Sequence, residues 1–127
     1  MSNLRTVQDF CDAWESGDVE RLMGFIHPDC VYQNMPRPPH VGAGEIRRQF
    51  ERFAGGAQAI RFINVHVAET ADGVVLTERI DRVTYEAGDA DVLTMGVFEL
   101  TDGLIVRWRD YYDEAQVMAA IKAARGA

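Results

Sequence analysis

Two segments with the alternating pattern of β-strands carry charged side chains on a face that is otherwise apolar. In residues 74–85, Arg79 and Asp81 are two positions apart and therefore point to the same side of the predicted strand. In residues 104–112, Asp110 lies between two aromatic residues on one face. A buried ion carries a desolvation penalty of several kcal/mol unless it is paired. These three residues therefore form either a structural ion pair between strands or the charged part of a functional site.

Two carboxylates beside one arginine could supply both an acid and a base. In apolar surroundings they do not easily both ionise, so we expect one of them to keep a proton near neutral pH. The spacing is symmetric, so the pattern alone does not decide which aspartate is the acid. A third strand-like segment adds polar groups, because Tyr32 and Asn34 share one of its faces.

Other chemistries find little support. The three histidines are scattered, with no H-E-x-x-H or paired Cys/His spacing, so we expect no metal site. The segment Gly42-Ala43-Gly44 lacks the third glycine of a dinucleotide-binding loop, and we expect no cofactor. The two serines, Ser2 and Ser16, lie outside any G-x-S-x-G motif. Lys122 is the only lysine and falls in an amphipathic segment near the C-terminus, which argues against Schiff-base chemistry.

The composition is that of a soluble globular protein and limits its partners. The 127 residues, 47% hydrophobic and 26% charged, fit one domain over residues 1–127. The net charge of −7 argues against binding to nucleic acid or to an anionic membrane. Neither a signal peptide nor an apolar run of about 20 residues is present, so we expect a cytoplasmic protein. Cys11 and Cys30 are too few for a disulfide scaffold, and Cys11 lies on an apolar helical stripe that favours packing.

The apolar periodicity predicts helices at both ends of the chain and strands between them. We expect helices over residues 4–14, 19–26 and 45–53 and after Asp113, and strands over residues 30–35, 60–68, 74–85, 92–100 and 104–112. Residues 71–73 and 101–103 read as hairpin turns, and residues 86–91 as a looser turn. Because parallel βαβ alternation is absent, the predicted fold class is α+β, with a curved antiparallel sheet wrapped around helices.

Three motifs together resemble the limonene-1,2-epoxide hydrolase family, a branch of the fold shared with nuclear transport factor 2, SnoaL-type cyclases and ketosteroid isomerase. The motifs are Tyr32-Gln33-Asn34-Met35-Pro36 with Pro38-Pro39, Thr77-Glu78-Arg79-Ile80-Asp81, and Gly96-Val97-Phe98 followed by Trp108-Arg109-Asp110-Tyr111-Tyr112-Asp113. Their order and spacing match from about residue 4 to the terminal helix. The resemblance implies a cone-shaped fold with a mixed sheet and a deep pocket.

The resemblance also implies a role for each of the five polar residues. The family's water-binding tyrosine and asparagine fall on Tyr32 and Asn34, and its bridging arginine falls on Arg79. Its acid and base fall on Asp81 and Asp110. The implied reaction is one-step addition of water to an epoxide, giving a vicinal diol without a covalent enzyme intermediate.

The resemblance further implies an apolar pocket, a small apolar epoxide as substrate and a homodimer. The matching strand faces would contribute Val83, Val92, Thr94 and Tyr112 to the pocket. Trp14, Leu22, Phe50 and Phe53 could close it from the helices, although core packing is the alternative for each of them. The chain departs from the family where it lacks the longer N-terminal extension of some members and where Arg37 interrupts the proline segment.

Two alternatives remain on the same fold. One is an isomerase or cyclase, in which an aspartate moves a proton beside a carbonyl group. That chemistry does not require Arg79 between the carboxylates or the water-binding Asn34. The other is a non-catalytic binding module, for which a complete set of five polar residues would not be needed.

Overall fold

The computed structural model describes residues 2–126 and contains four α-helices and a six-stranded mixed sheet. The elements are α1 (Asn3–Ala13), a 3-10 helix (Trp14–Ser16), α2 (Val19–Met23), β1 (Ile26–Met35), β2 (His40–Val41), α3 (Ala43–Gly55), β3 (Ala59–Glu69), β4 (Val75–Tyr85), β5 (Gly88–Thr101), β6 (Leu104–Tyr111) and α4 (Glu114–Ala124). The strand order is β2-β1-β6-β5-β4-β3. The α+β class is therefore as predicted.

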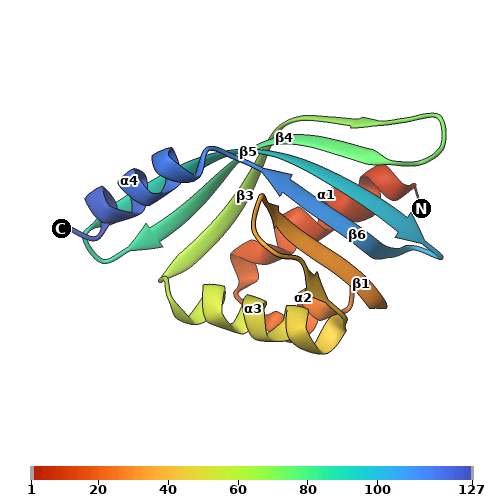
Figure 1. Cartoon of the computed structure of the whole chain (residues 1–127), viewed down its shortest axis with the longest axis horizontal. Coiled ribbons are helices and arrows are strands. Elements are labelled where there is room, and N and C mark those ends of the chain that lie inside the picture. Colours follow the sequence, from red (N-terminus) through yellow and green to blue (C-terminus); the bar gives the residue numbers. More distant parts are fainter. Residues whose placement is uncertain (1, 127) are drawn as a thin grey trace.

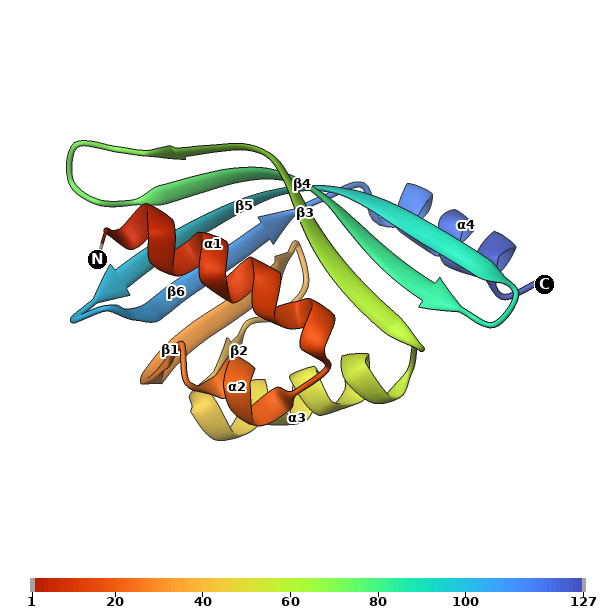
Figure 2. The same cartoon turned by 180° about the vertical axis from the view of Figure 1, so that it is seen from behind.

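The sheet is strongly curved, and α1, α2 and α3 lie on its concave side (Figure 1). Seen from behind, α1 crosses the sheet and α3 runs along its lower edge (Figure 2). Helix α4 lies beside the end of the β4–β5 hairpin that carries the turn. No helix within residues 2–126 combines the length and apolar character that crossing a membrane requires.

Strand pairing is antiparallel throughout except between β1 and β6, which run parallel. This pair makes the sheet mixed and places Asn34 directly beside Asp110. On β4 the burial alternates from Val75 to Arg82, so the odd-numbered residues of this stretch face the helices, as the sequence pattern predicts. On β6 the alternation is interrupted by a shift in register near Leu100, and Ile105 rather than Val106 is buried.

Aromatic side chains fill the space between the helices and the concave face. Phe10 of α1 meets Trp108 of β6 edge-on, with ring centroids 5.3 Å apart. Trp14 contacts Phe50 of α3 in the same manner at 4.9 Å. These arrangements are typical of packed aromatic pairs and fix the helices against the sheet. The functional residues of β4 and β6 therefore project into the interior.

The predicted aspartate caps of two helices and the predicted turn at residues 101–103 are confirmed. Asp18 and Asp113 accept a hydrogen bond from the backbone N–H three residues on, at the starts of α2 and α4. At the β5–β6 hairpin, Asp102 and Gly103 have φ values of 52° and 78°. Both residues of a type I′ turn need positive φ, so this turn matches its sequence signal.

Two local predictions are wrong. The second helix ends at Met23 rather than continuing to residue 26, because Ile26 pairs with Ile105 and begins β1. Residues 86–91 do not form a loose turn, since Tyr85 pairs with Gly88 and leaves a two-residue turn. In addition, a short strand that the sequence pattern did not indicate, β2, follows the prolines and pairs with β1. In each case the long-range or cross-strand pairing outweighs the local signal.

Candidate active site

Arg79 of β4 binds two carboxylates that come from different strands. Its Nε and Nη2 atoms donate hydrogen bonds to Asp81 Oδ1 and Oδ2 at 2.9 and 2.7 Å. Its Nη1 and Nη2 atoms donate to Asp110 Oδ1 and Oδ2 at 3.1 and 2.9 Å. Both contacts use two N–H groups and two carboxylate oxygens, the geometry in which a guanidinium binds a carboxylate most specifically. The three residues singled out from the sequence thus form one network.

The network is buried to different degrees. The Arg79 side chain has no exposed surface, whereas the side chains of Asp110 and Asp81 are 5% and 12% exposed. The guanidinium carbon lies 4.6 Å from the ring centroid of Phe62, which covers one side of the group. Asp81 is therefore the member of the network most accessible to a ligand.

Burial changes the proton affinity of this network. It raises the pKa of Asp81, and the neighbouring Asp110 charge acts in the same direction, while Arg79 opposes both. For Arg79, burial alone would lower the pKa, but the two carboxylates outweigh it and raise the pKa well above its ordinary value. One positive and two negative charges in a buried site favour a single shared proton, and Asp81 is suited to carry it.

Asp110 has one donor that Asp81 lacks. The indole Nε1 of Trp108, two residues earlier on β6, donates a hydrogen bond to Asp110 Oδ1 at 2.7 Å. Trp108 is itself held by stacking against Tyr32, with ring centroids 4.1 Å apart. A short hydrogen bond of this kind fixes the orientation of the carboxylate. The contact therefore distinguishes the two aspartates, which the sequence pattern did not.

Tyr32 and Asn34 of β1 lie next to Asp110. The Tyr32 hydroxyl donates to Asn34 Oδ1 at 3.1 Å, and Asn34 is the register partner of Asp110 on the neighbouring strand. Burial, together with the nearby Asp110 charge, raises the pKa of Tyr32 well above its ordinary value, so this hydroxyl stays protonated. The side-chain amide of Asn34 can both donate and accept, as binding of a water molecule requires.

Two further residues of the network were not predicted as site residues. Thr77 Oγ1 accepts a hydrogen bond from Arg79 Nη1 at 3.2 Å, and Gly96 of β5 lies between Thr77 and Asp110 in the register. A glycine inside a strand often marks a close approach of other atoms, and this was the signal available in the sequence.

The strand residues expected to line a pocket lie around the carboxylates. Val92 and Thr94 of β5 are the register partners of Asp81 and Arg79. Thr94 is buried, and Val92 and Val83 are half-buried. Tyr112 follows β6 and is half-buried, and burial raises its pKa.

The helical residues expected at the pocket pack in the hydrophobic core. Trp14, Leu22 and Phe50 are buried members of the core cluster, and Phe53 packs against it. Trp14 also stacks on Phe62 at 4.7 Å, so a single ring separates it from Arg79.

Two cavities open elsewhere on the molecule. One of about 100 Å³ is lined by Trp14 and Leu22 together with residues 57–60, and one of about 300 Å³ lies over residues 61–64. Neither is lined by Asp81 or Asp110.

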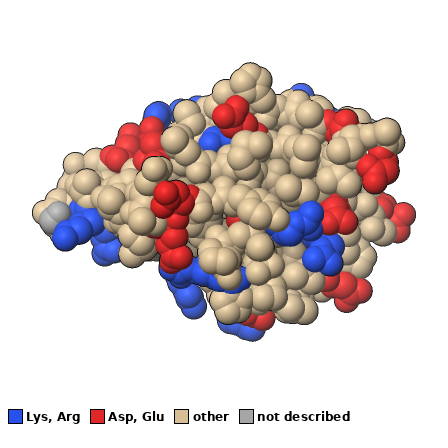
Figure 3. All heavy atoms as spheres, turned by 45° about the horizontal axis from the view of Figure 1, so that its top comes forward, with Lys and Arg blue, Asp and Glu red and all other residues tan. Residues whose placement is uncertain are grey.

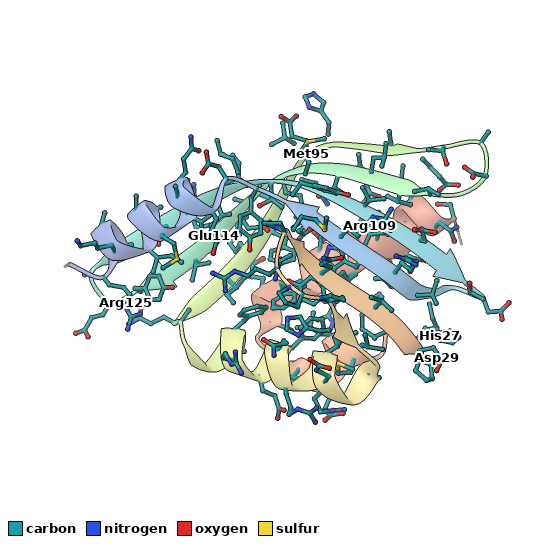
Figure 4. The ribbon with its side chains drawn as sticks, in the orientation of Figure 1. His27, Asp29, Met95, Arg109, Glu114 and Arg125 are labelled. Carbon is teal, nitrogen blue, oxygen red and sulfur yellow. The ribbon has the colours of Figure 1, made fainter. Side chains whose placement is uncertain are left out.

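Arg37, which departs from the family pattern, links the proline segment to α4. Its guanidinium pairs with Glu114 in the first turn of that helix, with Nε donating to Oε1 at 3.0 Å. The position of Glu114 at the start of α4 is visible in Figure 4. Both side chains are largely exposed, so the pair contributes little to stability.

Side chains suited to other chemistries are not assembled in the described part of the chain. Among residues 2–126, no group of three or more His, Cys, Asp and Glu side chains could hold a metal ion. Cys11 is buried, and burial raises the pKa of its thiol to about 12, so it stays protonated.

Comparison with known proteins shows the family of this chain and a similar curated protein. A family described as the SnoaL-like domain matches residues 7–108. The chain is also similar to Epoxide hydrolase EphG of Mycobacterium tuberculosis, with 29% identity over 108 residues. The matched region covers 84% of this chain and 70% of that protein.

Two solved structures have the same fold and different named activities. An M. tuberculosis LEH-like epoxide hydrolase superimposes with a TM-score of 0.83 at 24% identity, covering 96% of this chain and 90% of that one. A putative polyketide cyclase from Xanthomonas campestris pv. campestris has a TM-score of 0.82 at 18% identity, with 94% and 99% covered. These similarities confirm the predicted fold, and the residues of the site must carry any statement about the reaction.

Proposed function

This chain belongs to the SnoaL-like domain family, and on that premise we propose that it is an epoxide hydrolase that adds water directly to an epoxide ring. The observation that carries the proposal is the bridging of Asp81 and Asp110 by Arg79 beside Asn34. An epoxide opens slowly in neutral water, because water is a poor nucleophile and an alkoxide is a poor leaving group. The site offers a base for the first problem and an acid for the second.

In the proposed reaction, ionised Asp110 takes a proton from a water molecule held by Tyr32 and Asn34. The water oxygen attacks a ring carbon from the side opposite the C–O bond that breaks, and protonated Asp81 donates its proton to the departing oxygen. The product is a vicinal trans-diol, and Asp110 ends protonated while Asp81 ends ionised. Return of one proton through solvent restores the starting state, so no cofactor and no covalent intermediate are needed.

The assignment of acid and base is supported by the different surroundings of the two carboxylates. Asp110 is oriented by the hydrogen bond from Trp108 and is the register partner of the proposed water-binding Asn34, which suits it to act as the base. Burial raises the pKa of Asp81, which favours a proton on that residue. Asp81 is also the more exposed of the two, as a group that must reach the substrate should be.

We propose a small apolar epoxide as the substrate, either a limonene-1,2-epoxide-like terpene or a cyclic or meso epoxide. This part of the proposal is supported by the apolar side chains beside the carboxylates, Val83 and Val92, and by the burial of Thr94, the register partner of Arg79. Tyr112, half-buried after β6, is proposed to complete this wall. This wall would be supported from the hydrophobic core by four helical residues, Trp14, Leu22, Phe50 and Phe53.

Residues 1–127 would act as one domain, in the cytoplasm and as a homodimer. The dimer is supported by apolar side chains exposed on the convex face, where Leu93 and Met95 are 65% and 51% exposed. Met95 projects away from the helices (Figure 4). On the face seen in Figure 3, acidic and basic side chains are interspersed, without the single basic patch that a nucleic-acid partner would favour.

Hydrolysis in oxygen-18 water under single-turnover conditions tests the reaction directly. With direct attack, the first turnover places the solvent label in the diol, whereas an enzyme-ester route would first transfer an unlabelled carboxylate oxygen. Cyclohexene oxide and limonene oxide serve as substrates, and a Δ5-3-ketosteroid tests the isomerase alternative. Isomerisation of the steroid without epoxide opening would refute the proposal.

A further inference from the structure

Arg79 reaches Asp110 only by crossing a strand. Arg79 lies on β4 and Asp110 on β6, and β5 runs between them. Neighbouring strands are about 4.8 Å apart, so the guanidinium must lie across the backbone of β5 to contact both carboxylates. The register places Gly96 at the crossing point, since it pairs with Thr77 on one side and with Asp110 on the other.

The space above Gly96 is occupied by the network itself. A Cβ atom added there would lie 2.3 Å from Arg79 Nη1, 2.8 Å from Asp110 Oδ1 and 2.8 Å from Thr77 Oγ1. All three distances are shorter than real Cβ contacts, and the neighbours cannot easily withdraw, because Arg79 is buried and bound on both sides. A side chain at this position is therefore incompatible with the bridging geometry.

This glycine is not required by the backbone. Among the described residues, the glycines with positive φ lie at other positions, and Gly96 is within a regular stretch of β5. Glycine in a strand interior weakens the strand relative to a residue with a side chain. We attribute the glycine at this position to the space that it leaves for the Arg79 guanidinium.

Thr77 completes the arrangement from the β4 side. Its hydroxyl accepts a hydrogen bond from Arg79 Nη1 at 3.2 Å and donates one to the Gly96 carbonyl oxygen at 3.4 Å. With this contact each of the five guanidinium N–H groups has an acceptor, two from Asp81, two from Asp110 and one from Thr77. The guanidinium is thereby held in its plane.

We propose that Gly96 and Thr77 form a seat that positions the Arg79 guanidinium across β5, and that they are positioning residues for the site. The expected effects on kcat rest on the proposed epoxide hydrolysis. The expected effects on the titration of the two carboxylates do not, because the seat determines how they share a proton whatever the reaction is.

The seat predicts separable effects for substitutions at its two positions. In Gly96→Ala, the guanidinium or Asp110 must move, and a misplacement of about 1 Å in a catalytic group can lower the rate by about 10²-fold. We expect this loss in kcat, with KM changed by less than about threefold. Thr77→Val removes the fifth acceptor and leaves a buried N–H unpaired, which should lower kcat by about tenfold. Thr77→Ser restores the hydroxyl and should recover most of that loss.

The experiment compares these three variants with wild type and with Gly44→Ala. Gly44 is a matched control, because a Cβ there would meet no atom within 4 Å and its φ is not positive. Two readouts are collected: the pH dependence of kcat and KM on cyclohexene oxide, and the titration of 13C-labelled aspartate carboxyls by NMR. A role in stability alone would lower the melting temperature and leave both the pH profile and the NMR titration unchanged.

The outcomes separate the seat from the proposed function. The inference is supported if Gly96→Ala and Thr77→Val alter the carboxylate titration while Thr77→Ser and Gly44→Ala do not. It is overturned if Gly96→Ala folds with wild-type titration and kcat. If Gly96→Ala does not fold, equal titration and kcat in Thr77→Val and Thr77→Ser overturn it. If wild type opens no epoxide, the proposed function fails, and the NMR comparison still decides the inference.

Discussion

Replacing Trp108 by phenylalanine removes one hydrogen bond from Asp110 and keeps an aromatic ring in the core. In wild type the indole Nε1 donates to Asp110 Oδ1 at 2.7 Å, and the Trp108 ring stacks between Tyr32 and Phe98. The phenyl ring can occupy this stack but has no donor. The perturbation is therefore specific to the hydrogen bond that orients the carboxylate.

The expected size follows from the type of hydrogen bond. A hydrogen bond to a charged group contributes about 1.5–3 kcal/mol. Because this bond orients the base and about 1.4 kcal/mol corresponds to a tenfold change in rate, losing it should lower kcat/KM by about 10- to 100-fold. The smaller ring also leaves a void and lowers the free energy of unfolding by about 1–3 kcal/mol. Urea denaturation measures that second effect separately.

Trp14→Phe is the matched control for this measurement. Trp14 is also buried, but its Nε1 has no hydrogen-bond partner, so the same substitution removes no bond from either aspartate. The assay is kcat/KM on cyclohexene oxide at neutral pH, measured for both variants. We expect the loss of kcat/KM only in Trp108→Phe. If a folded Trp108→Phe protein keeps the wild-type kcat/KM, the hydrogen bond from Trp108 does not position Asp110 as the base, and this argument for the assignment is wrong.

Further predictions concern the acid, the base and the convex surface. Asp81→Asn should lower kcat by at least about 10²-fold in the same epoxide assay, because asparagine cannot donate the proton, and near-native activity would refute the acid role. Burial raises the pKa of Asp81, so the wild-type protein loses stability as the pH rises through that raised pKa. Asparagine does not titrate, so the stability of Asp81→Asn relative to wild type, measured by urea unfolding, should increase with pH. A decrease would contradict the raised pKa. For the same reason the wild-type kcat/KM should fall on the alkaline side as Asp81 loses its proton, and a flat alkaline side would be inconsistent with an aspartic acid as donor. Asp110→Asn should abolish turnover without unfolding the protein, which circular dichroism checks. Leu93→Lys places a charge on the exposed apolar face and should shift the mass measured by light scattering from dimer to monomer. A Leu93→Lys protein that stays dimeric would show that the convex face is not the interface.

The candidate site could be predicted because it depends mainly on strand parity. Arg79 and Asp81 share a face whatever the partners of their strand are, since side chains alternate along any strand. The same argument places Asp110 on the buried face of β6. Parity does not depend on long-range contacts, which is why a single sequence was sufficient for this step.

The features that could not be predicted depend on which strands meet. Ile26 lies in an apolar helical pattern, and only its parallel pairing with Ile105 assigns it to β1. The difference between the two aspartates arises from the indole of Trp108, and the role of Gly96 arises from a guanidinium that comes from the neighbouring strand. Each of these contacts is fixed by three-dimensional packing rather than by local propensity.

The pairing of β1 with β6 has a consequence for how the protein folds. It joins strands that are far apart in the sequence, so Asn34 meets Asp110 only after the elements from β2 to β6 have been synthesised. Contacts of such long sequence separation slow folding, because the intervening chain must be ordered before they form. The antiparallel hairpins from β3 to β6 can assemble first, with Arg79 and both aspartates already in register. The water-binding side of the site would then be added last, and in nascent chains that still lack β6 the strand β1 would have β2 as its only sheet partner.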